Sequence, residues 1–265
     1  MNEDGAKNRG LAQGREQILG IQFFNGTAAA AVAEASRGGL VVAPSGTCFE
    51  RFLRDEEYRR AILEADIVLP DSGLMVTLWR LLQRRRIQRI SGLAYLKAFL
   101  GSNKVEESRE TFWILPNERA RQRLLTAAHH WNFKVAPDDS YVAPIYGTRV
   151  QDTVLLGLIE ARRSNNIVIA IGAGPQEKLG WYLRGKLAHR SAIHCIGGAL
   201  GFLTGDQIAI PAWADRAYLG WLFRLFSQPK IFIPRLWRGR VLPRLILRYG
   251  NTLPPLRASK KGREG

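Results

Sequence analysis

The chain has 265 residues and a mass of 29.7 kDa, which is long enough to bury a core without disulfides or a structural metal. Hydrophobic residues make up 46% of it and charged residues 23%, so the composition excludes a wholly disordered or fibrous protein. It carries 39 Lys and Arg against 23 Asp and Glu, a net charge of +16. This excess indicates a polyanionic partner: nucleic acid, an anionic membrane face or a phosphate-bearing substrate.

The cysteines and the apolar runs limit the class of protein further. Cys48 and Cys195 are too few for a disulfide framework, and no Cys/His cluster has zinc spacing. Both are predicted to be small buried residues of a protein in a reducing compartment. Residues 1–15 are polar, unlike a signal peptide, and no uncharged apolar run reaches the roughly 20 residues of a transmembrane helix. We therefore expect a protein that is soluble or lies on a membrane.

Short apolar runs alternate with longer amphipathic stretches after residues 1–17, which are predicted to be a disordered lead-in. The runs have the length and the β-branched or aromatic content of buried strands; they are residues 19–24, 40–43, 67–69, 111–115, 133–136, 167–171 and 193–196. The stretches with helical periodicity are residues 27–37, 48–64, 74–82, 117–130, 151–163 and 176–187. The alternation predicts a Rossmann-like α/β core over residues 18–206, with a mostly parallel sheet covered by helices on both faces.

The composition changes after residue 206. Residues 213–227 are rich in Trp, Tyr and Phe, and the stretch that follows carries arginines and no acidic residue: Arg235, Arg238, Arg240, Arg244 and Arg248. Anionic lipids attract Lys and Arg, and Trp and Tyr suit the headgroup level. We predict that residues 207–250 form a basic helical appendage that binds a membrane through these arginines, followed by a disordered tail at 251–265. The alternative for residues 213–227 is a core helix.

An acidic residue follows one of the predicted strands directly. Residues 67–69 lead into Pro70, Asp71 and then Gly73, before a predicted helix. In open α/β sheets, ligands bind at the carboxyl ends of the strands, and a carboxylate there can act as a general base. The alternative is that Asp71 caps the helix that begins near Leu74.

Two glycine-containing stretches follow later strands. Gly172 and Gly174 precede Gln176 and Glu177 at a predicted helix start, the layout of a phosphate cradle. It is not a dinucleotide fingerprint, because Glu177 stands where the third glycine would be. Glu177 could equally be a capping partner.

The second glycine-rich stretch begins at Gly197 and Gly198. It either brings the backbone close to a ligand or packs a helix tightly on a strand. The sequence contains no Walker A motif, no Gly-x-Ser-x-Gly elbow, no HExxH and no Asp-x-Asp.

Together these motifs resemble the WecG/TagA/CpsF family of bacterial glycosyltransferases. The resemblance is carried by Val-Val-Ala-Pro-Ser at 41–45, Ala-Asp-Ile-Val-Leu-Pro-Asp-Ser-Gly at 65–73, Arg-Ile-Ser-Gly at 89–92, Gly-Ala-Gly-Pro-Gln-Glu at 172–177, Gly-Gly at 197–198, Pro-Ala-Trp at 211–213 and Trp-Leu-Phe-Arg-Leu at 221–225. These segments occur in the family's order at fitting spacing, over roughly residues 18–240.

The resemblance implies an inverting, metal-independent transferase without a cofactor. It would move an N-acetylmannosamine-like or related hexose from a UDP-sugar to a polyprenyl-diphosphate-linked sugar, for cell-envelope or exopolysaccharide synthesis. Asp71 would deprotonate the acceptor hydroxyl, and the matching substrate-binding residues are Ser45, Arg89, Gly172, Gly174, Gln176, Glu177, Gly197 and Gly198. Such an enzyme is cytoplasmic and peripheral on the inner face of the plasma membrane. A homo-oligomer is compatible with the sequence.

The chain departs from the family's pattern at several positions, most of which are polar in the family. These are Ser45, Ala94, Leu200, Gly201, Ala209 and Gly220. The changes predict either another substrate choice or a catalytically degenerate homologue that acts as a binding or scaffold protein in a polysaccharide assembly complex. We favour activity, because Asp71, Arg89, Gln176 and Glu177 are retained. Nucleic-acid binding is suggested by charge alone, without a recognised module, and is not expected.

Overall fold

The computed structural model describes residues 14–46, 48–102, 111–130, 135–203 and 241–257. Its strands are β1 (Gly14–Ile18), β2 (Ile21–Asn25), β3 (Gly39–Val42), β4 (Ile67–Val68), β5 (Thr111–Leu115), β6 (Ser140–Val142), β7 (Asn166–Ile169) and β8 (Ala192–Cys195). Its helices are α1 (Ala28–Ala35), α2 (Cys48–Phe52), α3 (Glu56–Leu63), α4 (Gly73–Gln83), α5 (Gly92–Ser102), α7 (Glu118–His130), α8 (Thr153–Arg162), α9 (Pro175–Lys186), α10 (Ala199–Leu203) and α14 (Val241–Tyr249), with a 3-10 turn η2 (Pro137–Asp139).

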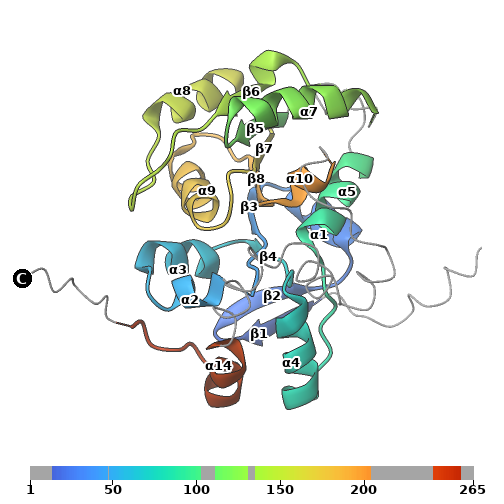
Figure 1. Cartoon of the computed structure of the whole chain (residues 1–265), viewed down its shortest axis with the longest axis vertical. Helices are drawn as coiled ribbons and strands as arrows, with labels where there is room; N and C mark the ends of the chain where they lie inside the picture. The colour runs from blue at the N-terminus through green and yellow to red at the C-terminus, as the bar shows by residue number, and fades with distance from the viewer. Residues whose placement is uncertain (1–13, 47, 103–110, 131–134, 204–240, 258–265) are drawn as a thin grey trace, which may run out of the picture.

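The strands form one eight-stranded sheet in the order β1-β2-β4-β3-β8-β7-β5-β6. The β1–β2 pair is antiparallel and every other described pair is parallel. Figure 1 shows the sheet edge-on, with α2, α3, α8 and α9 on one face and α1, α5, α7 and α10 on the other. The prediction of an α/β fold with a mostly parallel, doubly covered sheet is therefore confirmed.

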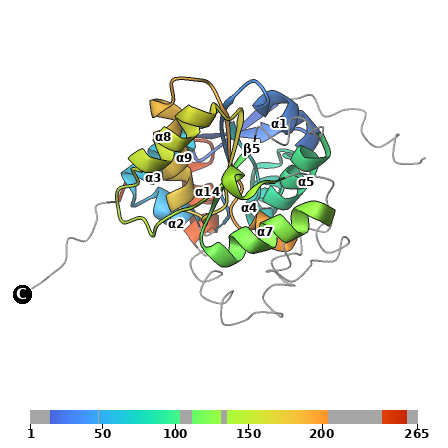
Figure 2. The same cartoon turned by 90° about the horizontal axis from the view of Figure 1, so that it is seen from above.

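Two hydrophobic cores lie on opposite faces of this sheet. One packs α2, α3, α4, α8, α9 and α14 against it, and the other packs α1, α5, α7 and α10. Seen from above in Figure 2, α3, α8 and α9 lie on one side and α1 and α5 on the other. Cys48 and Cys195 are buried free cysteines in the first core, as predicted.

The predicted lead-in is wrong at its C-terminal end. Residues 14–17 belong to β1, which forms a hairpin with β2. Its turn, Leu19 and Gly20, has φ of 53° and 78°, as a type I′ turn requires. The backbone N–H groups of Leu19 and Gly20 donate to the carbonyls of Gly250 and Asn251, each at 2.9 Å. The C-terminal segment thus holds the turn, a contact that no local pattern near residue 14 could indicate.

The predicted disordered tail is also wrong for its first residues. Arg59 Nη2 donates to the Pro254 carbonyl at 2.6 Å, and the Arg257 N–H donates to the Leu53 carbonyl at 2.7 Å. Pro254 is buried. Residues 251–257 therefore pack against the α2–α3 region, whereas residues 258–265 lie outside the described part.

Two predicted elements differ inside the core. The predicted helix over residues 48–64 is two helices, because the Asp55 side chain accepts a hydrogen bond from the Tyr58 N–H at 3.0 Å and so caps α3. Residues 135 and 136 do not form the predicted strand at 133–136, since Pro137 starts η2 and the strand follows as β6. Residues 133 and 134 lie outside the described part.

A buried histidine joins β8 to the second core. His194 Nδ1 lies 2.9 Å from the Tyr95 hydroxyl of α5, and the His194 and Phe99 ring centroids are 4.6 Å apart. Burial lowers the pKa of His194 to about 3. The imidazole is therefore neutral near pH 7, with Nε2 3.4 Å from Asn166 Oδ1 and Nδ1 accepting from Tyr95.

We expect acid to destabilise the fold through His194. The unfolded chain takes up a proton near pH 6.5, whereas folded His194 does so only near pH 3, so the free energy of unfolding falls as pH drops between these values. From pH 7 to pH 5 this loss is about 2 kcal/mol. Urea unfolding at both pH values should show a loss about 2 kcal/mol smaller in His194→Gln. The same pH dependence in both proteins would contradict this assignment.

Candidate active site

The carboxyl ends of four neighbouring parallel strands carry the residues singled out in the sequence. β4 pairs with β3, β3 with β8, and β8 with β7. The loops after them contain Asp71, Ser45, Gly197 and Gly172, respectively. The first half of the chain meets the second at the β3–β8 pair, the kind of point where ligands bind in open α/β sheets.

Asp71 is not the cap of the helix that follows it. Ser72 Oγ accepts the hydrogen bond from the Met75 N–H at 3.2 Å and caps α4, so the capping alternative for Asp71 is wrong. Asp71 is half-buried, and its Oδ1 accepts from the Gly92 N–H at 3.2 Å. The carboxylate is thus held at the first residue of α5.

Arg89 lies beside Asp71. Its Nε donates to the Asp71 carbonyl oxygen at 2.9 Å, and the Ile90 N–H donates to the Pro70 carbonyl at 3.3 Å. The segment after α4 therefore returns along the helix to its starting point. This return brings the motifs at 67–73 and 89–92 together.

Asp71, Arg89 and Gly92 form what we call the Asp71 corner, and the loop after β8 lies against it. A Cβ on Gly92 would lie 3.2 Å from the Ile196 carbonyl oxygen, and a Cβ on Gly197 would lie 3.3 Å from Gln176 Nε2. Gly197 has φ of 59°, a conformation that favours glycine. The loop after β8 therefore lies close to Gly92, which binds Asp71, and close to the Gln176 side chain. Asp71 and Gln176 thus lie at the same edge of the sheet.

Gln176 has an unused hydrogen-bonding atom. Its side chain is 1% exposed, and Nε2 donates to Glu177 Oε1 at 3.0 Å. Its Oε1 is buried and has no hydrogen-bond partner among the described residues. A buried acceptor without a partner costs about 1–3 kcal/mol, so a ligand hydroxyl or N–H that reached it would be favoured.

Glu177 is fully buried and holds its neighbours in place. Its Oε2 accepts from the Gly174 N–H at 2.5 Å, while Oε1 accepts from Gln176. Burial raises the pKa of Glu177, and these hydrogen bonds oppose the rise. Of the two roles considered for Glu177, the structure shows the capping partner of α9, which also orients Gln176.

The two glycines before α9 differ in what they can offer a ligand. Gly172 has φ of 98°, and a Cβ on it would meet no atom of the described residues within 4 Å. The Gly174 N–H is already bonded to Glu177, and the Arg51 guanidinium occupies the place of a Cβ on Gly174. Gly174 therefore cannot donate its N–H to a phosphate, whereas no described residue fills the space beside Gly172.

Arg51 is a candidate binding residue that the sequence reasoning missed. It is exposed on α2, its Nη1 donates to the Ala173 carbonyl at 2.7 Å, and its guanidinium lies 5.7 Å from the Tyr58 ring centroid. It puts a positive charge at the N-terminus of α9. No local signal marked it, because Arg51 and Ala173 are 122 positions apart.

The remaining predicted binding residues lie around this corner. Ser45 Oγ is 3.4 Å from Cys48 Sγ, and a Cβ on the adjacent Gly46 would lie 3.0 Å from Ser72 Oγ. Gly198 is exposed just before α10. The loops after β3, β4 and β8 thus share one edge of the sheet.

The predicted membrane-binding arginines are only partly described. Arg244 and Arg248 are exposed on α14, which packs against the first core, whereas Arg235, Arg238 and Arg240 lie outside the described residues. Ala209 and Gly220, two of the positions that depart from the family's pattern, also lie outside the described residues. Within the described ranges, no helix is both long and apolar enough to cross a bilayer. No three His, Cys, Asp or Glu side chains gather as a metal site in those ranges either.

Comparisons with known proteins agree with the motifs at this edge. The chain matches the model of the glycosyl transferase WecG/TagA/CpsF family over residues 16–254. It is also similar to the N-acetylglucosaminyldiphosphoundecaprenol N-acetyl-beta-D-mannosaminyltransferase of Bacillus subtilis (strain 168), with 26% identity over 180 residues, 67% of each chain. The residues that the family model matches include Asp71, Arg89 and Gln176. The chain therefore belongs to the WecG/TagA/CpsF family of glycosyl transferases, and it is a glycosyltransferase.

Proposed function

We propose that the protein transfers an N-acetylmannosamine-like or related hexose from a UDP-sugar to a polyprenyl-diphosphate-linked sugar, with inversion. The observation that carries this proposal is the placement of Asp71 at the carboxyl edge of the sheet, bonded to Gly92 instead of capping α4. The family and the acceptor named for the Bacillus subtilis relative support the same reaction class.

Asp71 is proposed to be the general base. Its carboxylate takes the proton of the acceptor hydroxyl while that oxygen attacks the anomeric carbon, and the bond to the leaving UDP breaks on the opposite face. Attack from the side away from UDP inverts the anomeric centre. The Gly92 N–H on Oδ1 and Arg89 on the Asp71 carbonyl limit the rotation of the base, which favours a productive approach.

The leaving diphosphate is proposed to lie near the N-terminus of α9. Arg51, the positive end of the helix dipole and Arg89 would stabilise its negative charge. No described side chain fills the space beside Gly172, so the diphosphate could approach its backbone closely. Gln176 Oε1 would accept a hydrogen bond from a hydroxyl or N–H group of the UDP-sugar. In this arrangement the chain's own cations replace a metal ion.

Because the acceptor is lipid-linked, we propose that the enzyme acts at the anionic inner face of the plasma membrane. The exposed arginines of α14, Arg244 and Arg248, are proposed to contact it from the cytoplasmic side. Assembly into a homo-oligomer stays a prediction.

The test is UDP release from a panel of UDP-sugars, with and without a polyprenyl-diphosphate-linked sugar, and with and without EDTA. We expect release from one donor class that requires the lipid acceptor and persists in EDTA. Loss of release in EDTA would overturn metal independence alone. No acceptor-dependent release from any UDP-sugar would overturn the proposal and favour the degenerate binding or scaffold protein.

A further inference from the structure

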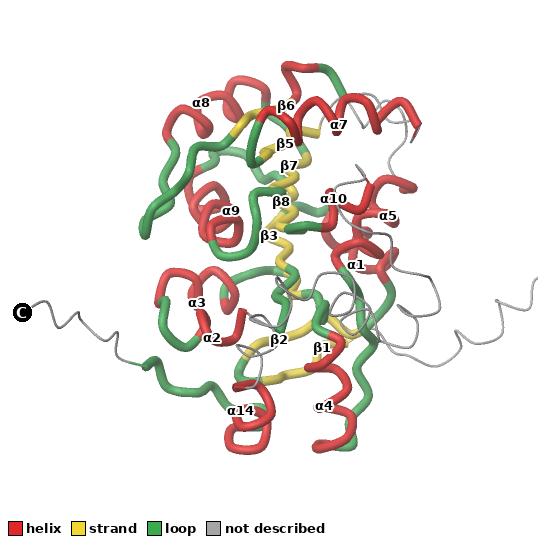
Figure 3. Tube along the Cα trace, in the orientation of Figure 1, coloured by secondary structure: helices red, strands yellow, loops and turns green. Residues whose placement is uncertain are grey.

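The C-terminal ends of α4 and α14 form one end of the molecule. Figures 1 and 3 show both helices beside the β1–β2 hairpin, away from α7 and α8. A Cβ on Gly250, the residue after α14, would lie 3.9 Å from Gln83 Nε2 at the end of α4. We define the α4–α14 surface by exposed side chains of the last turn of α4, of the residues that follow it and of α14: Leu81, Arg84, Arg85, Arg86, Arg244, Leu247 and Arg248.

Two large apolar side chains of this surface face solvent. Leu81 is 71% exposed and Leu247 is 66% exposed, although α14 also has an apolar face buried in the first core. A single exposed leucine needs no explanation. Exposed leucines on two adjoining helix ends, flanked by arginines, are typical of helices that lie in a lipid headgroup layer.

The charge of the surface is positive throughout. Residues 72–105 and 241–257 contain no Asp or Glu. In the part of the chain that the structure describes, the Arg84 and Arg86 guanidinium groups have no ion pair or hydrogen bond, and Arg85 Nη1 lies 3.4 Å from Glu16 Oε1. Arg84 and Arg86 are therefore available to an external anion, whereas Arg85 already faces Glu16.

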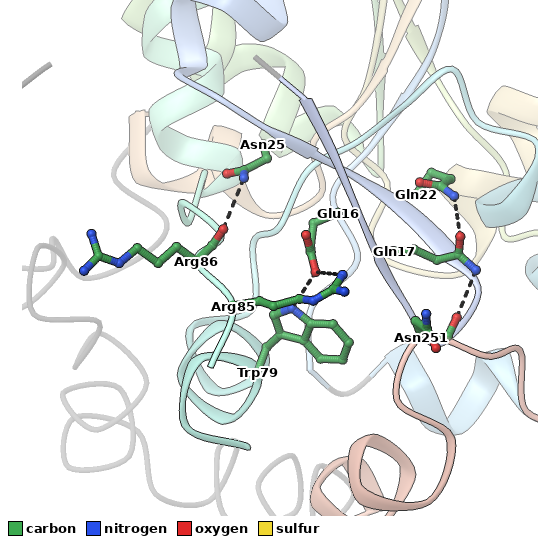
Figure 4. A network of polar contacts seen from close by, with 8 residues as sticks. All are labelled: Glu16, Gln17, Gln22, Asn25, Trp79, Arg85, Arg86 and Asn251. Atoms are coloured by element: carbon green, nitrogen blue, oxygen red, sulfur yellow. Dashed lines mark hydrogen bonds and ion pairs between the residues drawn. The ribbon is translucent and has the colours of Figure 1, made fainter. Parts of the chain in front are cut away.

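The backbone that presents these arginines is held firmly. Trp79 Nε1 of α4 donates to Glu16 Oε1 of β1 at 3.0 Å, Asn25 Nδ2 donates to the Arg86 carbonyl at 3.2 Å, and the Gln88 N–H donates to Asn25 Oδ1 at 3.0 Å. Figure 4 shows the Arg86 guanidinium pointing away from this network while its carbonyl is bound within it. Such anchoring lowers the entropy lost when the surface binds a planar partner.

We propose that the α4–α14 surface rests on an anionic phospholipid bilayer, so that the catalytic core itself contacts the membrane through residues 81–86. This inference rests on the proposed function, because it gives the base access to a lipid-linked acceptor. α4 begins two residues after Asp71 and has 11 residues, so its axis spans about 16 Å. One rigid helix would then set the height of Asp71 above the lipid headgroups.

The test is co-sedimentation of the full chain with vesicles of phosphatidylglycerol and phosphatidylcholine, compared with phosphatidylcholine alone. We expect Arg84→Gln/Arg85→Gln/Arg86→Gln to weaken binding to the anionic vesicles at least about tenfold. Leu81→Gln/Leu247→Gln should weaken binding to them without changing the net charge. Circular dichroism would confirm that each variant is folded.

Matched controls come from the other end of the molecule. Arg119→Gln/Arg149→Gln/Arg163→Gln removes the same charge from α7, from the loop before α8 and from the residue after α8. Arg163 shares with Arg84 a φ of 52°. Ile145→Gln/Val154→Gln removes two exposed apolar side chains. Both controls should bind anionic vesicles as wild type does. Equal weakening in the test and control triple variants would overturn the proposal, since net charge alone would then explain binding.

Activity separates this inference from the proposed function. With a short-chain, water-soluble acceptor, the α4–α14 variants should release UDP at the wild-type rate, because none of these residues lies at the Asp71 corner. One combination of results is that the α4–α14 variants lose vesicle binding while the wild-type protein releases UDP from no UDP-sugar. That combination would support the surface and overturn the proposed function. Unchanged vesicle binding would overturn the surface as a membrane contact. Unchanged vesicle binding together with a changed oligomeric state in sedimentation equilibrium would mark the surface as a contact between copies.

Discussion

Asp71→Asn is expected to lower sugar transfer about 10²- to 10⁴-fold, the usual contribution of a general base. The asparagine oxygen can still accept from the Gly92 N–H, which lies 3.2 Å from Asp71 Oδ1, so the start of α5 should stay in place. An amide cannot take the proton of the acceptor hydroxyl. Ser72, not residue 71, caps α4, so the helix should keep its stability.

The measurement combines initial rates of UDP release with calorimetric binding of the donor. The rate should fall in Asp71→Asn, while the donor Kd should stay within about threefold of wild type because the substitution leaves the α9 side of the site unchanged. Asp138→Asn, which removes an exposed carboxylate on η2, is the matched control and should keep full activity. Full transfer by Asp71→Asn would remove Asp71 as the base.

Glu177→Gln is expected to cost about 1–3 kcal/mol of unfolding free energy and to weaken donor use. The buried carboxylate accepts from two donors, the Gly174 N–H at 2.5 Å and Gln176 Nε2 at 3.0 Å. A glutamine offers one acceptor oxygen and brings a donor of its own, so one N–H loses its partner. The loop before α9 and the Gln176 side chain should then lose their fixed positions.

A positioning role for Glu177 can be separated from a merely structural one. Steady-state rates below the unfolding temperature should show a raised donor KM in Glu177→Gln and in Gln176→Ala, with the double variant little worse than either single variant. The effects on the donor KM are expected to be non-additive, because both substitutions act on the side-chain amide of Gln176. Glu160→Gln, which changes a carboxylate that accepts from the Ala188 N–H, is the control and should leave the KM unchanged. Lower stability with an unchanged donor KM would limit Glu177 to the fold.

Much of the sheet could be predicted from the apolar runs and from the Gly, Pro, Asn and Asp residues that bound them. The runs that became β3, β5, β7 and β8 are short, apolar and bounded by breakers, because strands buried on both faces leave no polar alternation. β1 was missed for the opposite reason: its residues, Gly-Arg-Glu-Gln-Ile, are mostly polar, and it pairs only with β2 at the edge of the sheet. Its turn is held by residues 250 and 251 at the other end of the chain.

The α/β class, the family resemblance and the positions of Asp71, Gln176 and the glycines at strand ends could be predicted from the sequence, because strand-to-helix transitions leave local signatures. Which contacts these residues make became visible in the three-dimensional structure. It assigned the cap of α4 to Ser72, buried Glu177 beneath Gln176, and brought Arg51 to Ala173 across 122 positions. It also joined the ends of α4 and α14 in one basic surface. The physical reason is that hydrogen-bond partners and burial are set by packing between segments distant in sequence, which no local pattern encodes.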